Sequence, residues 1–255
     1  LENRVSDMPP PYHRSGNVLL NKLFGASSST FHIGEDEAAA DANIADIAKD
    51  FAKKGKKPYL LTLSPDTKPL GALGYIRCAG EILDQLNNQK QSVDKIVVAS
   101  GSAATHVGIL LGLRLLGSEI PVHGICVRRD RNQQILRVEG IVRLAEHLIG
   151  CGKVVQNKDI KCHDDWLAPG YGKTNGLVHE AMVLAGSLEG MIVDPVYTAK
   201  SLAGAIGLYR LGVFNNSQNI LYLHTGGMPA LFAYEDEITE KLNEGSSIKY
   251  QNNKP

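Results

Sequence analysis

Residues 97–108, VVASGSAATHVG, join a strand-like run to a helical pattern through a loop of small and hydroxyl side chains. Small residues let an anion approach the free backbone N–H groups at the positive end of a helix dipole. Ser100, Ser102 and Thr105 add hydroxyl donors, so the pattern favours a bound phosphate group. An ordinary turn capped by Ser100 or Ser102 explains the same residues, and the loop alone does not decide between the two interpretations.

Three further loops combine turn residues with polar side chains. Their sequences are APGYGKTNG at 168–176, DPVYTAKS at 194–201 and YLHTGGMPALFAY at 222–234. Each has a structural explanation, because tyrosines pack at half-buried positions and paired glycines form turns. A parallel sheet brings such strand-end loops together, which favours one shared site.

Strand-like runs alternate with helical patterns along the chain, and this order positions the loops. Strands are expected at 30–33, 59–63, 96–99, 121–127, 191–193 and 220–223, and helices at 18–24, 37–53, 70–86, 105–116, 134–149, 177–188 and 198–210. The alternation predicts an α/β fold with a mainly parallel twisted sheet flanked by helices. Ligands of such sheets bind at the carboxyl ends of the strands.

The composition excludes several classes of protein. The 255 residues balance 27 basic against 27 acidic side chains without a basic stripe, so we expect no nucleic-acid partner and no membrane partner. The four cysteines form no CxxC pair, which argues against a metal site and a disulfide framework and favours a reducing cytoplasm. There is no GxSxG or GxxxxGK[ST] motif, and LGALGYIR at 70–77 lacks the GxGxxG fingerprint of a nucleotide-dependent oxidoreductase.

Together the motifs resemble the D-cysteine desulfhydrase and 1-aminocyclopropane-1-carboxylate (ACC) deaminase family, which are pyridoxal-phosphate (PLP) enzymes of the tryptophan-synthase-β-like fold, fold type II. The segments that carry the resemblance occur in the family's order: SGNVLLNKLFGA, KPYLLTL, PLGALGYIRCAGEI, VVASGSAATHVG, APGYG, SLEGMIVDPVYTAKSLAG and HTGGMPALFAY. The resemblance implies two domains, with the remainder of a small α/β domain at 1–65 and a large cofactor-binding domain at 66–255. It also implies a homodimer that acts on a small amino acid.

The same resemblance implies roles for individual residues. Tyr171 and Tyr197 correspond to active-site tyrosines that assist proton movement, and Thr198 corresponds to the position beside the pyridine nitrogen. The remaining cofactor-binding positions are Ser102, Ala103, Ala104 and Thr105 in the phosphate cradle and Thr225 and Gly226 beside the cofactor ring. Ala104 departs from the glycine of desulfhydrase-like members.

Two family segments do not occur in this sequence: a GGNKxRK-like segment, whose lysine forms the Schiff base, and a QSNH-like segment. Because residues 1–3 resemble the family only beyond both segments, we expect an N-terminally incomplete member whose Schiff-base lysine lies outside this chain. Lys200 does not readily replace that lysine, since members carry a lysine there as well as the catalytic one. Lys68 lies in a loop where members usually have a glycine-serine turn.

The expected function is therefore PLP-dependent β-elimination and deamination of a D-cysteine-like amino acid to a 2-oxo acid and ammonia. Thr198 favours this reaction over ACC deamination, because deaminase-type members have a glutamate there that favours a protonated ring nitrogen. Two alternatives stay open: an ACC deaminase, and a non-catalytic truncated or split member that binds phosphate ligands or a partner chain. For these 255 residues acting alone, we expect no turnover.

Overall fold

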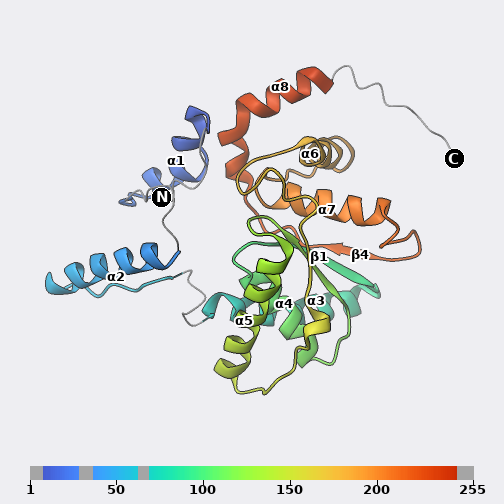
Figure 1. Cartoon of the computed structure of the whole chain (residues 1–255), viewed down its shortest axis with the longest axis horizontal. Helices are drawn as coiled ribbons and strands as arrows, with labels where there is room; N and C mark the ends of the chain where they lie inside the picture. The colour runs from blue at the N-terminus through green and yellow to red at the C-terminus, as the bar shows by residue number, and fades with distance from the viewer. Residues whose placement is uncertain (1–7, 29–36, 63–68, 246–255) are drawn as a thin grey trace.

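The computed structural model describes residues 8–28, 37–62 and 69–245 (Figure 1). Four parallel strands form one sheet in the order β3-β2-β1-β4: β1 Lys95–Ser100, β2 Val122–Cys126, β3 Lys161–His163 and β4 Ile220–Tyr222. The α-helices are α1 Asn17–Leu23, α2 Glu37–Lys53, α3 Leu70–Gln89, α4 Ala104–Leu115, α5 Arg131–Ile149, α6 Gly176–Glu189, α7 Thr198–Arg210 and α8 Glu235–Gly245. Short 3₁₀ helices are η1 Pro10–His13, η2 Asn157–Asp159 and η3 Met228–Tyr234. The predicted α/β class is confirmed.

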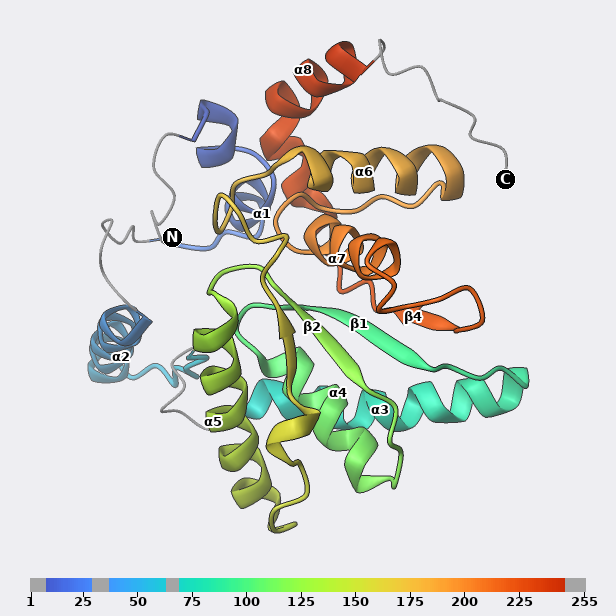
Figure 2. The same ribbon diagram turned by 45° about the vertical axis from the view of Figure 1, so that its right-hand side comes forward.

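Helices cover both faces of the sheet (Figure 2). Helices α3, α4 and α5 lie on one face, and α6 and α7 lie on the other. Strand β1 has a continuous run of apolar residues because it contacts both layers of helices. Ile96 and Val98 pack with Leu110 on the first face, while Val97 packs with Phe214 on the second. Successive strand side chains point to opposite faces, and both faces here are buried.

The N-terminal part of the chain contacts its C-terminal part. Helix η1 packs on η3, and the rings of Tyr12 and Tyr234 meet edge to face at 5.8 Å. Tyr12 and Tyr234 share a small apolar cluster with Val196 and Tyr171. Helix α2 stands apart from the sheet in both views (Figures 1 and 2).

Helix predictions agree closely with the structure, whereas two strand predictions are wrong. Residues 59–62 form no strand, and Tyr59 is 77% exposed. Residues 191–193 also form no strand, although Val193 is buried. A strand requires a neighbouring ladder to pair with, and within 8–28, 37–62 and 69–245 neither segment has one. Residues 30–33 and Leu63 lie outside the described residues.

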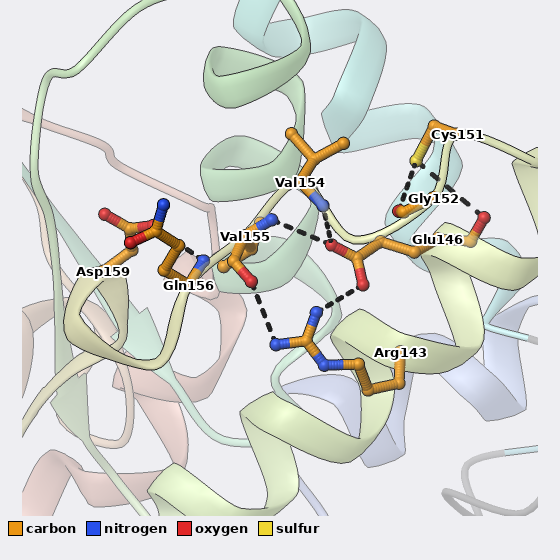
Figure 3. Close-up of polar contacts among 8 residues, drawn as sticks. All are labelled: Arg143, Glu146, Cys151, Gly152, Val154, Val155, Gln156 and Asp159. Carbon is orange, nitrogen blue, oxygen red and sulfur yellow. Dashed lines mark hydrogen bonds and ion pairs between the residues drawn. The ribbon is translucent and has the colours of Figure 1, made fainter.

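Strand β3 was not predicted, because its three residues, KCH, contain no apolar run. A buried carboxylate at the end of α5 holds the segment that leads into it (Figure 3). Glu146 accepts hydrogen bonds from the N–H groups of Val154 at 2.7 Å and Val155 at 2.8 Å. Arg143 pairs with this carboxylate at 2.5 Å and donates to the carbonyl of Val155 at 2.9 Å. Glu146 therefore neutralises one charge and satisfies two backbone donors.

Replacing Glu146 with alanine is expected to lower the free energy of unfolding by about 3 kcal/mol, because the N–H groups of Val154 and Val155 lose their acceptor and the partly exposed Arg143 loses its ion-pair partner. Urea denaturation measures the change. The matched control is Glu139→Ala, a partly exposed position two turns earlier on α5, with an expected change within about 0.5 kcal/mol. Equal effects at the two positions would contradict the assigned role of Glu146.

Candidate active site

The loops that follow β1 and β4 both start at the carboxyl-terminal end of the sheet. The two strands pair in parallel with Val97 opposite Tyr222, and the N–H of Leu223 donates to the carbonyl of Val97 at 2.9 Å. Beyond β4, Gly227 has a φ of +91°, and a Cβ there would lie 2.6 Å from Oδ1 of Asp194. The turn at 225–227 therefore packs directly on the loop that begins at Asp194.

Helix α4 begins in the loop after β1 without a side-chain cap. Its N-cap, Ala103, is buried and has a φ of +77°, and no side chain among the described residues accepts a hydrogen bond at this end. Helices α5 and α6, by contrast, begin with Asp130 and Asn175, whose side chains accept backbone N–H groups. A positive φ is strained for alanine, and residues with such a strained backbone cluster at ligand-binding positions. The start of α4 thus offers donors to an anion.

Side chains from the segment at 129–137 hold the carbonyl groups of this loop. Arg129 donates to the carbonyl of Gly101 at 3.1 Å, and Arg137 donates to the carbonyl of Ser102 at 3.0 Å. Gln134 also reaches the carbonyl of Gly101 at 3.3 Å. These two carbonyl groups thus accept hydrogen bonds from side chains that lie outside the loop. Sequence reasoning missed these three residues, of which only Gln134 lies in the polar run DRNQQ at 130–134.

The structure brings the two predicted catalytic tyrosines together. The hydroxyls of Tyr171 and Tyr197 hydrogen-bond at 2.6 Å although they are 26 residues apart, and Arg128 lies 5.9 Å from the ring centroid of Tyr171. Tyr197 also borders the loop after β1, because its Cε1 would lie 3.7 Å from a Cβ at Gly101. The paired hydroxyls can donate and accept protons beside the start of α4.

Buried side chains anchor the backbone on both sides of Tyr171. Lys200, which is fully buried, donates to the carbonyls of Leu167 at 3.1 Å and Gly170 at 2.5 Å. Tyr234 donates to the carbonyl of Gly172 at 2.5 Å. Burial lowers the pKa of Lys200 to about 8 and raises the pKa of Tyr234 well above its ordinary value. Lys200 therefore fixes the loop that carries Tyr171.

Asp194 organises the start of α7. Its carboxylate accepts the N–H groups of Val196, Tyr197 and Thr198 at 2.8–2.9 Å. The hydroxyl of Thr198 donates to Oδ1 of Asp194 at 2.6 Å and accepts the N–H of Asp194 at 2.6 Å, and Thr198 is fully buried. The Thr198 hydroxyl is thus satisfied by the protein itself. Asp194, the residue that positions Tyr197 and Thr198, was not singled out from the sequence.

The other predicted site residues differ in their exposure to solvent. Ser102 and Thr225 are exposed, Thr105 is partly exposed in the first turn of α4, and Gly226 has a φ of +94°. The methyl group of Ala104 faces α3, since it would lie 3.4 Å from a Cβ at Gly71. The extra methyl at this position, where the resembling enzymes have glycine, is thus accommodated against α3.

These features fit a phosphate-bearing cofactor. The uncapped start of α4 supplies backbone donors, and the loop before it is narrow, because a Cβ at Gly101 would lie 3.0 Å from Cγ2 of Val127. Among the described residues no group of histidine, cysteine, aspartate and glutamate side chains is placed to hold a metal ion. The arrangement defines an α/β protein with an anion-binding helix start beside a pair of tyrosines.

The chain belongs to the pyridoxal-phosphate dependent enzyme family, whose sequence pattern matches residues 6–226. It is 36% identical over 238 residues to a D-cysteine desulfhydrase of Salmonella paratyphi A and 37% identical to that of Salmonella choleraesuis. In both cases the match covers 93% of this chain and 70% of the relative. The predicted family is confirmed.

A solved structure, an ACC deaminase homologue, matches with a TM-score of 0.76 and 33% identity. This match covers 89% of the chain and 66% of that structure. The predicted fold type II class is confirmed. No helix in the described part of the chain is long and apolar enough to cross a membrane.

Proposed function

We propose that this protein binds PLP, with the phosphate at the start of α4, and catalyses β-elimination from D-cysteine, which with uptake of water gives pyruvate, ammonia and hydrogen sulfide. The observation that carries the proposal is the hydrogen-bonded pair of Tyr171 and Tyr197, which lies beside the uncapped start of α4. The D-cysteine desulfhydrase relatives support the choice of reaction. PLP, when bound, withdraws electrons from the Cα of an amino-acid substrate, so that its proton and β-substituent can leave.

Residues of this chain bind the phosphate and transfer protons. The N–H groups at the start of α4 bind the phosphate, while Ser102 and Thr105 add hydroxyl donors. Tyr171 and Tyr197 hold a proton between their hydroxyl oxygens and deliver it at the reacting end of the site. Thr225 and Gly226 border the cofactor ring.

Thr198 supports elimination over opening of a cyclopropane ring. Its buried side chain is a neutral hydroxyl that is bonded to Asp194. A neutral group beside the ring nitrogen gives less support to a protonated ring than a carboxylate does. The weaker electron withdrawal suits a thiol, which leaves readily, better than a ring that has no ordinary leaving group.

The amine that links the cofactor is proposed to be a lysine other than Lys200, because the Nζ of Lys200 is buried and bonded to two carbonyls. We further propose that residues 66–255 form the cofactor-binding domain and residues 1–65 form part of a smaller one. The proposal includes a cytoplasmic homodimer, on the basis of the family resemblance.

The test uses the protein purified from its native cells and three substrates. It measures pyruvate and sulfide from D-cysteine, pyruvate from L-cysteine, and ammonia and 2-oxobutanoate from ACC. We expect faster turnover of D-cysteine than of either other substrate. Faster turnover of ACC would contradict the proposed reaction, and cofactor binding without turnover would favour the non-catalytic alternative. Borohydride reduction and peptide mapping locate the linking lysine, and a pyridoxyl group on Lys200 would contradict its assignment.

A further inference from the structure

Directly behind the loop that follows β1 lies a buried chain of three polar side chains. Ser100 is the last residue of β1, His106 lies in the first turn of α4, and Gln134 lies on α5. Nδ1 of His106 is 3.1 Å from Oγ of Ser100, and Nε2 of Gln134 donates to the same oxygen at 2.8 Å. All three are at most 1% exposed. The chain therefore joins the strand end, the helix start and a second helix beneath the loop.

The chemistry of the groups sets the direction of these hydrogen bonds. The amide nitrogen of Gln134 only donates, so Oγ of Ser100 accepts from it and has its own hydrogen for Nδ1 of His106. Nδ1 of His106 then accepts that hydrogen. In the part of the chain that the structure describes, Oε1 of Gln134 has no hydrogen-bond partner. The imidazole of His106 also lies beside the thiol of Cys162, and hydrogen bonds with Cys126 and His106 lower the pKa of that thiol. Core stability alone disfavours an unsatisfied buried amide oxygen.

Strand β2 leaves space for the imidazole at one position. A Cβ at Gly124 would lie 2.4 Å from Cε1 and from Nδ1 of His106, and 3.0 Å from Cβ of Ser100. Any larger residue at 124 would displace the ring. The absence of a side chain at Gly124 on this central strand therefore leaves room for His106 beside Ser100.

We propose that Ser100, His106 and Gln134 form a positioning unit, which we call the Ser-His-Gln unit, that sets the phosphate selectivity of the site. It spans the loop by joining its two ends, and Gln134 also holds the carbonyl of Gly101. A fixed spacing between β1 and α4 keeps Ala103 at its positive φ and keeps the N–H groups of α4 aimed at the phosphate. The inference rests on the proposed function and deepens it.

The test compares pyridoxine 5′-phosphate with pyridoxine by isothermal titration calorimetry. The two probes differ only in the phosphate, and neither has an aldehyde, so no lysine is required. The ratio of the two affinities measures phosphate selectivity and is not expected to follow general stability. For His106→Leu and Gly124→Ala we expect this ratio to fall about tenfold or more, the effect of misplacing one charge-assisted hydrogen bond.

Three matched variants separate positioning from packing. His106→Asn places an acceptor near Nδ1 and should restore most of the selectivity that His106→Leu loses. His123→Asn removes another buried imidazole, which bonds to His163 on the neighbouring strand at 3.0 Å, and should leave the ratio unchanged. Gly140→Ala adds a methyl where no atom lies within 4 Å and should also leave it unchanged.

The outcomes distinguish this inference from the proposed function. Unmodified protein that binds both probes equally would remove the phosphate site, and with it the positioning unit. A second outcome is that the unmodified protein prefers the phosphate ester and that the folded His106→Leu and Gly124→Ala variants prefer it equally. This result would overturn the positioning unit and leave the proposed function intact. If His106→Leu does not fold, the ratios of His106→Asn and Gly124→Ala decide the matter.

Discussion

Replacing Thr105 with aspartate is expected to lower the affinity for pyridoxine 5′-phosphate by at least about a hundredfold, since a carboxylate beside a bound phosphate at a partly buried site repels it by several kcal/mol. Thr105 lies in the first turn of α4, whose N-cap residue Ala103 provides no side-chain acceptor for the backbone N–H groups. An aspartate there would accept those N–H groups itself and would repel the phosphate. The same carboxylate favours the helix dipole, so the free energy of unfolding should stay unchanged or rise by about 0.3–1 kcal/mol.

This combination of weaker binding and unchanged stability is the feature that calorimetry and urea denaturation test together. Thr105→Ser is the control, because it retains the hydroxyl and should bind the ester nearly as well as the unmodified protein. Unaltered binding in the aspartate variant would mean that the loop after β1 is only a structural turn.

Helices were predicted well because their signal is local. The pattern at 37–53 and 198–210 gives both helices with the bounds that the structure has, since an apolar stripe recurs with the helical period. The strands predicted at 59–63 and 191–193 failed for a different reason. Apolar residues such as Leu61 and Val193 satisfy a strand pattern, but pairing depends on which strands are adjacent, and the local sequence does not contain that information.

The site shows the same division between local and tertiary information. The family resemblance assigned Tyr171 and Tyr197 to one site, and the general rule that loops after parallel strands converge favoured a shared site. Residues 191–193, just before the Tyr197 loop, form no strand, so the contact between the two tyrosines comes from tertiary packing. The donors from Arg129 and Arg137 to the loop carbonyls depend on how α5 packs beside α4, so no spacing in the sequence indicates them. The contact of Thr198 with Asp194 is local, four residues apart, and an aspartate just before a helix was a signal that sequence reasoning could have used.

Replacing Tyr197 with phenylalanine is expected to lower the turnover of D-cysteine by about 10²–10⁴-fold, the range for loss of a general acid or base. The ring stays, so its packing beside Gly101 is kept. What disappears is the hydroxyl that bonds to Tyr171 at 2.6 Å. Affinity for pyridoxine 5′-phosphate should change little, because the proposed phosphate site uses backbone groups at the start of α4.

A double-mutant comparison shows whether the two tyrosines act as one unit. If Tyr171 and Tyr197 share a single proton, the double phenylalanine variant should be about as slow as the slower single variant, because residues that act as a unit are strongly non-additive. Tyr209→Phe is the control, since that half-exposed hydroxyl bonds to Asn216 at the surface. Independent losses that multiply in the double variant would show that each tyrosine handles a different proton. Turnover unchanged in Tyr197→Phe would remove the pair from the chemistry altogether.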